Sequence, residues 1–386
     1  MPAIRSAGPI GSCWMIPTLR SCPRILNGVL AGSVPASTCL ACIVVPVRVA
    51  GCRLPDAEKL LIAGIRGRAT SRSRAIATGI GDDCAILKIP QGHQTLVTTD
   101  FSLEGVHFRR EWHPAEVVGH RCLTRGLSDI AAMGGNPIAA LLSLAVPQSL
   151  PQSWINRFLK GFLKLAGQFH VTLAGGDTAE SPGGILADIV VVGSVPKGKA
   201  IRRSGARAGD RVYVTGALGG AAATLKLLFA GRKLRTVDFP HHFRPIPRIE
   251  VGQFLLEKGL ASGMIDLSDG LSTDLGHICD ESGVGAEIQA SAIPRARIGK
   301  PSRTVELEFA LNGGDDYELL FASPPDKRVP SRIAGIPITQ IGQITRDKHV
   351  LLANENGVAL KLKPQGWEHF KGREVLAPEN QQMISK

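Results

Sequence analysis

The sequence predicts two domains that each combine strands and helices, of the α/β or α+β class. Its 386 residues, 44% of them hydrophobic, are enough for two domains with sizeable cores. Short apolar runs of the strand type alternate with helix-type stretches in both halves, a pattern typical of mixed domains. The basic, glycine-rich stretch 196–210 (PKGKAIRRSGARAGD) separates the two halves. We therefore expect an N-terminal domain over 53–200, a C-terminal domain over 201–372 and a tail over 373–386.

The expected elements of the N-terminal half follow from apolar spacing and from residues that start and stop helices. Pro114 begins one helix and Gly134 and Gly135 end it, as proline and glycine do at helix termini. Helices are expected over 57–65, 114–133 and 153–169. Strands are expected over 95–99, 171–174 and 185–192, the last two with the apolar character of buried strands.

The C-terminal half gives signals of the same two kinds. Strands are expected over 211–215, 264–267, 285–288, 318–322 and 338–344. Helices are expected in an alanine-rich segment that ends at Phe229, and over 249–258 and 271–281. A polar loop is expected over 232–246. The tripeptide Leu-Ser-Asp occurs twice, at 127–129 and 267–269, each time within or before a helix.

The net charge of +12 does not indicate nucleic-acid binding, because it is unevenly distributed. The first 78 residues hold ten basic and two acidic residues, whereas the other 308 hold 35 and 31. A nucleic-acid surface would interleave basic and aromatic side chains, and aromatic residues are 5% of the chain. No apolar run reaches the roughly 18 residues that span a bilayer.

The cysteines and the first fifty residues set the N-terminus apart. Cys84, Cys122 and Cys279 are expected to be buried thiols of a reduced, cytoplasmic protein. Cys39 and Cys42 form a CxxC motif without a second pair, so it is a weak zinc or redox signal. The first fifty residues contain no acidic residue and no clear periodicity. We expect residues 1–52 to be a disordered extension, or upstream sequence translated from an early start codon.

Six aspartate-bearing stretches, most of them rich in glycine, carry the chemistry. They are GIGDD (79–83), TTDFSLEGVHF (98–108), LSDIAAMGG (127–135), AGGDTAE (174–180), IDLSDG (265–270) and NGGDDYEL (312–319). Glycine lets the backbone approach a ligand closely, and aspartate is a hard oxygen ligand. Carboxylates without histidine or cysteine favour Mg²⁺, Mn²⁺ or Ca²⁺ over zinc. Any one stretch alone is more typical of a turn or a helix cap, but six in one chain indicate a metal site.

A carboxylate cluster with glycine-rich stretches indicates phosphoryl transfer, in which positioning and electrostatics supply most of the catalysis. The familiar nucleotide motifs are absent from the sequence: it has no P-loop motif, no kinase motif set and no third glycine after Gly79-Ile80-Gly81. The spacing at Asp266-x-Ser268-x-Gly270 also differs from that of a calcium-binding EF-hand loop.

In this order, the stretches resemble the thiamine-monophosphate kinase family, whose superfamily includes aminoimidazole ribonucleotide synthetase and selenophosphate synthetase. The matching strings are GIGDDCAIL, TTDFSLEGVHF, LSDIAAMGGNP, AGGDT, RRSGARAGDRVYVTG, IDLSDGLSTDLGHI, NGGDDYELLF and GWEHF. The resemblance implies Mg²⁺-assisted phosphorylation of thiamine monophosphate by ATP, giving thiamine diphosphate. It also implies an aminoimidazole ribonucleotide synthetase-like fold, with an N-terminal domain that forms a dimer-spanning β-barrel and a C-terminal α+β domain.

The resemblance assigns residues to three roles. The implied metal-site residues are Asp83, Thr98, Thr99, Asp100, Asp129, Asp177, Asp266 and Asp269. The implied ATP contacts are Gly176, Asp177, Arg203 and Ser268. The implied substrate contacts are His107, Asp315 and Trp367, whose indole would stack on a thiamine ring. Asp129 and Asp177 are expected to be the most critical, and Asp82 to support the turn that presents Asp83.

The chain departs from the family pattern at three positions. Asp315 stands where the family usually has Glu, Gly126 where Asn is frequent, and Ala179 in place of the second threonine of GGDTT. The acceptor phosphate has a second pKa near 6, so no residue is expected to act as a general base and the transfer is expected to be direct. Two alternatives stay open: another ATP-dependent enzyme of the superfamily, such as an aminoimidazole ribonucleotide synthetase, and a non-catalytic divalent-metal-binding module.

Overall fold

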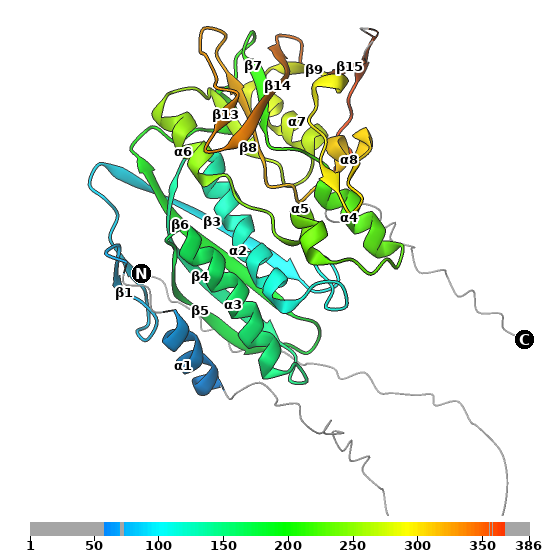
Figure 1. Ribbon diagram of the computed structural model, residues 1–386. Helices are drawn as coiled ribbons and strands as arrows, with labels where there is room; N and C mark the ends of the chain where they lie inside the picture. Colours follow the sequence, from blue (N-terminus) through cyan, green and yellow to red (C-terminus); the bar gives the residue numbers. More distant parts are fainter. Residues whose placement is uncertain (1–57, 70–72, 355, 357, 367–386) are drawn as a thin grey trace, which may run out of the picture. The chain divides into compact units, whose positions relative to one another are not determined.

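The computed structural model describes residues 58–69, 73–354, 356 and 358–366. The predicted extension 1–52, the CxxC motif, Trp367 and the predicted tail 373–386 lie outside these ranges. Figure 1 shows the order of the elements along the described chain.

The N-terminal half is built on a four-stranded sheet whose strand order is β3-β6-β4-β5. Its strands are β3 (His93–Leu103), β4 (Asn136–Val146), β5 (Thr172–Glu180) and β6 (Leu186–Pro196). Figure 1 shows helices α2 (Ala115–Ala132) and α3 (Gln152–Gln168) across one face of this sheet. The other face is partly covered by β1 (Ile76–Thr78) and β2 (Ile86–Leu87), and α1 (Glu58–Arg68) precedes them.

The C-terminal half contains an eight-stranded sheet in which β13 pairs with β14, beside the path β16-β15-β9-β14-β7-β12-β8. Its strands are β7 (Arg211–Thr215), β8 (Gly263–Asp266), β9 (Gly285–Gln289), β12 (Leu319–Ser323), β13 (Arg332–Ile333), β14 (Ile336–Thr345), β15 (Val350–Ala353) and β16 (Ala359–Lys361). The helices of this half are α4 (Gly220–Phe229), α5 (Pro240–Phe243), α6 (Ile249–Glu257), α7 (Leu271–Ser282) and α8 (Leu307–Asn312). A short ribbon joins β10 (Arg297–Ile298) to β11 (Arg303–Thr304).

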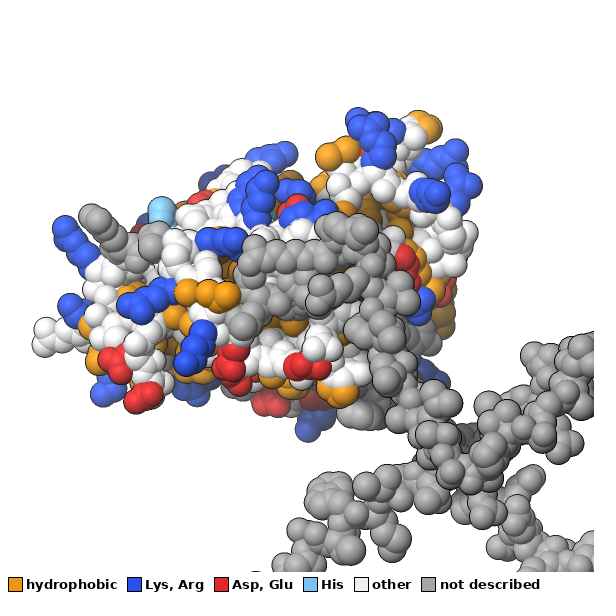
Figure 2. All heavy atoms as spheres, turned by 90° about the horizontal axis from the view of Figure 1, so that it is seen from below, with side chains coloured by type: hydrophobic (Ala, Val, Ile, Leu, Met, Phe, Trp, Pro, Cys, Tyr) orange, Lys and Arg blue, Asp and Glu red, His pale blue; other side chains and the backbone are white. Residues whose placement is uncertain are grey.

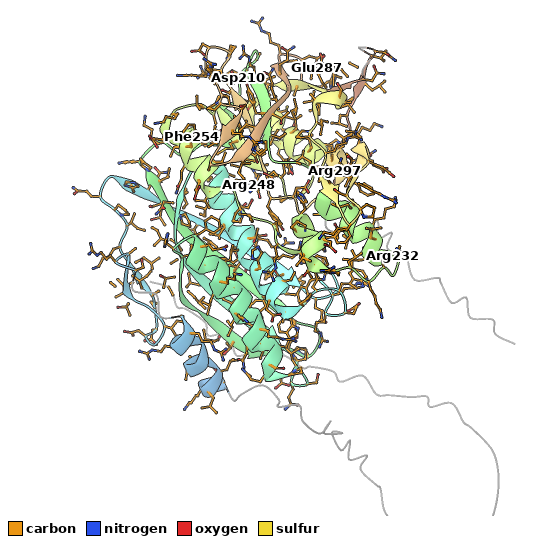
Figure 3. All side chains as sticks on the ribbon, viewed as in Figure 1. Asp210, Arg232, Arg248, Phe254, Glu287 and Arg297 are labelled. Atoms are coloured by element: carbon orange, nitrogen blue, oxygen red, sulfur yellow. The ribbon has the colours of Figure 1, made fainter. Side chains whose placement is uncertain are left out.

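The two halves pack on each other around helix α2. One hydrophobic cluster includes residues of α2 and α3 together with Leu255, Met264 and Phe321 of the second half. A buried ion pair reinforces the second half: the Arg248 guanidinium, labelled in Figure 3, donates to both carboxylate oxygens of Glu318. The Thr215 hydroxyl donates to the same carboxylate. Through the hydrophobic cluster, helix α2 packs against α3 on one side and against the second half on the other, which fixes the side chains that it presents between the halves.

The structure corrects several expectations about local structure. Strand β4 was not predicted, the strand expected over 95–99 continues to Leu103 in β3, and the strand expected over 171–174 continues to Glu180 in β5. The expected polar loop 232–246 contains helix α5. Cys84 was expected to be buried but is exposed, whereas Cys122 and Cys279 are buried as predicted. The mixed two-domain character of the fold is confirmed.

Beyond residue 78, basic and acidic residues are nearly balanced in number, and the surface reflects this balance. Figure 2 shows basic, acidic and apolar side chains interspersed on one face of the molecule. Among the described residues, no helix is both long and apolar enough to cross a membrane.

Candidate active site

Four of the six aspartate-bearing stretches meet where α2 faces the C-terminal half. The Thr98 hydroxyl of β3 donates to the Asp129 carboxylate in the last turns of α2. The Ser128 hydroxyl donates to Asp266 Oδ2 at the end of β8, at 2.6 Å. The two Leu-Ser-Asp repeats thus lie close together. We call Asp100, Asp129, Asp266 and Asp269 the inner cluster.

Burial and mutual repulsion raise the carboxylate pKa values in the inner cluster. Burial and the Asp129 charge raise the pKa of Asp100 to about 6, although the Arg125 charge acts against them. Burial and the charges of Asp129 and Asp100 raise the pKa of Asp266 to about 7. Burial also raises the pKa of Asp129, although the Thr98 hydrogen bond and the charges of Arg203 and Arg125 act against it. The cluster therefore carries more negative charge than its own cations balance.

A second carboxylate group lies on the opposite face of the N-terminal sheet. Asp188 of β6 pairs with Ser143 of β4, which in turn pairs with Asp177 of β5, so the three side chains share a face. The Thr99 hydroxyl donates to Asp188 Oδ1 at 2.7 Å. We call Thr99, Asp188 and Asp177 the outer row. Thr98 and Thr99 are adjacent in β3 and therefore point to opposite faces.

Asp83 and Asp177 are exposed, and no hydrogen bond among the described residues joins either to the inner cluster. The Asp83 amide donates to Asp82 Oδ1 at 3.0 Å, as expected for a supporting role of Asp82. The Asp177 carboxylate accepts from the Thr178 amide. At Gly176, with φ of 145°, an added Cβ would overlap the Leu142 carbonyl, so glycine is required for the strand pairing itself.

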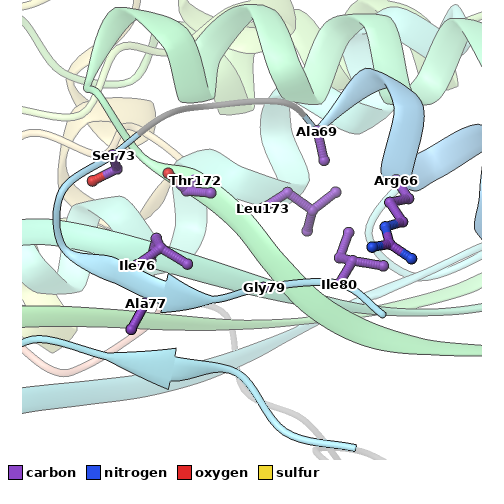
Figure 4. Close-up of a pocket in the computed structure, with 9 residues that line it drawn as sticks. All are labelled: Arg66, Ala69, Ser73, Ile76, Ala77, Gly79, Ile80, Thr172 and Leu173. Carbon is purple, nitrogen blue, oxygen red and sulfur yellow. The ribbon is translucent and has the colours of Figure 1, made fainter. Parts of the chain in front are cut away.

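The stretches 79–83 and 174–180 lie near each other beside a small cavity, shown in Figure 4. The cavity has a volume of about 230 Å³ and is lined in part by Arg66, Gly79, Thr172 and Leu173. The buried Thr172 hydroxyl has no hydrogen-bond partner among the described residues. The glycine-rich turn before Asp83 therefore borders a partly polar cavity and is not densely packed on that side.

Asp315 lies in a strained loop beside the inner cluster. It adopts φ of 66°, and Tyr317 adopts φ of 52°, a region that non-glycine residues rarely occupy. The Asp315 amide donates to the Ser268 carbonyl at 2.9 Å, which joins the stretches 312–319 and 265–270. The Asp315 carboxylate accepts from Arg121 at 2.8 Å, Arg125 at 3.2 Å and the Tyr317 hydroxyl at 2.6 Å. Although burial raises the pKa of Asp315, the two arginines lower it well below its usual range.

The remaining predicted residues have separate positions. The His107 ring accepts a hydrogen bond from the Leu103 amide through Nδ1, in the loop that follows β3. Arg203 is exposed in a short 3₁₀ turn, close enough that its charge acts on Asp129 and Asp266. Ser268 contributes its backbone carbonyl to the contact with Asp315. Trp367 lies outside the described residues.

Sequence reasoning missed three charged residues of this site. Asp188 and Arg125 could have been noticed as charges inside an apolar strand and in the middle of an apolar helix. The carboxylate of Asp274, the third, accepts from the amides of Asp269 and Gly270 and so caps α7. Burial and the charges of Asp266 and Asp269 raise the pKa of Asp274 to about 8. Asp269, Asp274 and His277 offer ligand atoms within 4.8 Å of one another.

Comparison with known proteins decides the family. The model of the AIR synthase related protein N-terminal domain matches residues 81–195, and that of the C-terminal domain matches residues 207–353. The thiamine-monophosphate kinase of Salmonella typhimurium is 37% identical over 324 residues, covering 81% of this chain and 98% of that protein. The chain belongs to the thiamine-monophosphate kinase family.

Other thiamine-monophosphate kinases agree with this assignment. The Bacillus subtilis enzyme is 35% identical over 324 residues, covering 81% of this chain and 98% of its own. The crystal structure of the Stenotrophomonas maltophilia K279a enzyme superposes with a TM-score of 0.68 at 34% identity, covering 80% of this chain and 98% of that chain. A structure of AaThiL complexed with AMPPCP and TMP gives a TM-score of 0.65 at 30% identity, covering 81% of this chain and 97% of that chain. The two-domain fold predicted from the sequence is that of this thiamine-monophosphate kinase family.

Proposed function

We propose that the chain transfers the γ-phosphoryl group of ATP to thiamine monophosphate and forms thiamine diphosphate. The observation that carries the proposal is the inner cluster, a set of half-buried and buried carboxylates that meets at the junction of the two halves. The near-complete coverage of thiamine-monophosphate kinases supports the same reaction, as does the complex of one relative with AMPPCP and TMP.

The donor set of the inner cluster fits Mg²⁺. It consists of hard carboxylate oxygens without a thiolate, and burial and mutual repulsion, which a bound cation would offset, raise the pKa values of Asp100 and Asp266. We propose that the residues that hold Mg²⁺ are those of the inner cluster and the outer row predicted from the sequence, together with Asp83 and Thr98. These are Asp83, Thr98, Thr99, Asp100, Asp129, Asp177, Asp266 and Asp269. Bound Mg²⁺ would supply the positive charge that offsets the repulsion between the two reacting phosphate groups.

The protein itself positions the reactants. Gly176, Asp177, Arg203 and Ser268 are the proposed ATP contacts, and His107, Asp315 and Trp367 are the proposed contacts of the acceptor. At neutral pH the acceptor phosphate is already mostly ionised, so no side chain has to remove a proton from it. In-line attack by this phosphate oxygen on the γ-phosphorus forms the new P–O bond as the bond to ADP breaks. A phosphorylated residue trapped during a single turnover would contradict this direct transfer.

Substrate choice can be tested with a panel of acceptors. We expect the purified chain to consume ATP with thiamine monophosphate and not with thiamine or with formylglycinamidine ribonucleotide. Turnover with the ribonucleotide alone would favour an aminoimidazole ribonucleotide synthetase-like activity. Metal binding without ATP consumption for any acceptor would favour a non-catalytic module.

We also propose that the chain is a homodimer in which the N-terminal sheets of two copies close into one barrel. The outer face of the sheet exposes apolar side chains: Val97 is 66% exposed and Phe101 54% exposed. Leu141, Leu186 and Val190 lie on the same face and are half-buried. Apolar area of this kind favours burial against a partner, and closure into a barrel removes free sheet edges.

Light scattering tests the dimer. We expect the purified chain to have the mass of two copies, and the double variant Val97→Asp, Phe101→Asp to have the mass of one copy with an intact far-ultraviolet spectrum. A monomeric wild-type chain at micromolar concentration would contradict the proposal.

We also propose the domain division and the cellular location of the chain. The domain division at 200–201 is supported by the position of this segment between β6, which ends at Pro196, and β7, which begins at Arg211. A cytoplasmic location is consistent with a reaction that consumes ATP.

A further inference from the structure

Two side chains in the second half of helix α2 are partly exposed to solvent. From Arg121 to Ala132 its residues are buried, except for Arg125 and Asp129, which are half-buried. They are four residues apart and therefore lie one turn apart on the same face of the helix. Asp129 belongs to the inner cluster. Its neighbour Arg125 is thus a partly exposed cation beside the inner cluster, which the metal and nucleotide assignments do not use.

Arg125 is only partly engaged by the protein. Its side chain is 13% exposed, and Nη2 donates to Asp315 Oδ1 at 3.2 Å, its single hydrogen bond to a described residue. A guanidinium has five N–H donors arranged in a planar fork, so several remain for a ligand. Arg121, one turn earlier, differs: its side chain is 5% exposed and it donates to both the His242 carbonyl and Asp315.

The unused donors of Arg125 suit the oxygens of an anionic ligand. Arg121 and Arg125 share one carboxylate, that of Asp315, and the third partner of this carboxylate is the neutral Tyr317 hydroxyl. The Arg125 charge also acts on Asp100 and Asp129, so this residue lies beside the inner cluster. A phosphate group held by Mg²⁺ at the inner cluster would meet the free donors of the Arg125 fork.

We propose that Arg125 binds the phosphate group of the acceptor and that Asp315 positions Arg125 for this contact. The proposal rests on the proposed function and adds a residue that holds the attacking phosphate. Planar guanidinium groups match phosphate oxygens through paired hydrogen bonds. Asp315 carries one methylene fewer than the glutamate usual in the family, and its carboxylate is drawn onto Arg121, Arg125 and Tyr317. The strained loop backbone fixes the carboxylate in this position.

The competing explanation is that Arg125 only ties α2 to the loop 312–318 through its ion pair. The two explanations differ in which ligands they affect. A phosphate contact acts on thiamine monophosphate but not on thiamine, which lacks the phosphate. A purely structural tie acts on both ligands equally.

Calorimetric binding of the two ligands therefore tests the proposal. The full chain is titrated with thiamine monophosphate and with thiamine, in the presence of Mg²⁺ and a non-hydrolysable ATP analogue. For Arg125→Met we expect about 10-fold or more weaker binding of thiamine monophosphate, as for the loss of a charged hydrogen bond, and thiamine affinity within about 2-fold of wild type. Arg125→Lys keeps the charge without the fork, so its loss should be intermediate. It also serves if the Met variant does not fold.

Arg121→Met is the matched control, because it breaks an ion pair to the same carboxylate from the same helix face. We expect it to change the affinities for the two ligands by equal factors. Equal losses for both ligands in Arg125→Met, or no loss for either, would overturn the proposal. If the wild-type chain phosphorylates thiamine monophosphate, equal or absent losses in Arg125→Met overturn only the role of Arg125 and leave the proposed function intact. If the wild-type chain neither binds nor phosphorylates thiamine monophosphate, the proposed function fails and the role of Arg125 with it.

Discussion

Replacing Asp266 by asparagine should stabilise the metal-free protein while it abolishes activity. Asp266 is 3% exposed and lies beside the charges of Asp129 and Asp100, so its ionised form is disfavoured in the folded state. Asparagine has nearly the same shape, and its carbonyl oxygen can still accept the hydrogen bond from Ser128. The substitution therefore removes the repulsion and keeps the packing.

The size of the effect follows from the raised pKa. Burial first, and then the charges of Asp129 and Asp100, raise the pKa of Asp266 from 3.8 to about 7. At about 1.4 kcal/mol per pKa unit, ionising Asp266 at pH 8 costs the folded state up to about 4 kcal/mol. Neighbouring charges relax when one is removed, so we expect a gain of about 1–3 kcal/mol for Asp266→Asn. Sites shaped for function commonly sacrifice stability in this way.

The sign of the pH dependence is fixed by the direction of the shift. Because the folded-state pKa is above the unfolded value, the penalty is absent below about pH 4, grows between about pH 4 and 7, and is complete above that range. Urea unfolding in EDTA at pH 5 and pH 8 measures it. The stabilisation by Asp266→Asn should be larger at pH 8, and the exposed-site control Asp326→Asn should show no such difference. A variant less stable than wild type at pH 8, or a gain equal at both pH values, would refute the reasoning.

Three further outcomes are expected. Asp129→Asn should lower kcat at least about 100-fold in a steady-state assay while the protein stays folded. The reason is that this residue joins β3 to the inner cluster. Retained activity would exclude Asp129 from the site. Arg248→Met should lower the free energy of unfolding by about 3–5 kcal/mol in urea titrations, because it leaves the buried Glu318 carboxylate without its cation. A loss below about 1 kcal/mol would contradict a stabilising role of this ion pair. Thiol reagents should label Cys84 quickly and Cys122 only on unfolding, since burial raises the pKa of Cys122 to about 12; equal rates would contradict the fold.

Strong local signals made part of the fold predictable. The strand at 211–215 and the start of the helix at 271 were predicted as observed, because apolar runs there are bounded by glycine and polar residues. Strand β4 was missed, because its run NPIAALLSLAV begins with Asn-Pro and then shows neither clear alternation nor helical spacing. The stretch 174–180 is a strand despite its glycines, because β4 pairs along its whole length. Such pairing is a tertiary effect that local propensity does not reveal.

The candidate site was predictable in its chemistry and less so in its geometry. Hard oxygen ligands in six stretches indicated a divalent metal, but the sequence did not separate the inner cluster from the outer row. Alternation along the predicted strand 95–99 already sends Thr98 and Thr99 to opposite faces, and its continuation to Leu103 in β3 brings Asp100 onto the face of Thr98. Arg125 could be noticed in the sequence as a charge inside an apolar helix, but only the packing of α2 between the two halves places it beside the inner cluster.

The most direct test of the account is product formation by the purified chain, with chromatography of the thiamine phosphates. With ATP, Mg²⁺ and thiamine monophosphate, we predict one thiamine diphosphate for each ADP, no product when EDTA is in excess, and the same activity from residues 53–386. Consumption of ATP without thiamine diphosphate, or product formation that is unaffected by EDTA, would contradict the account.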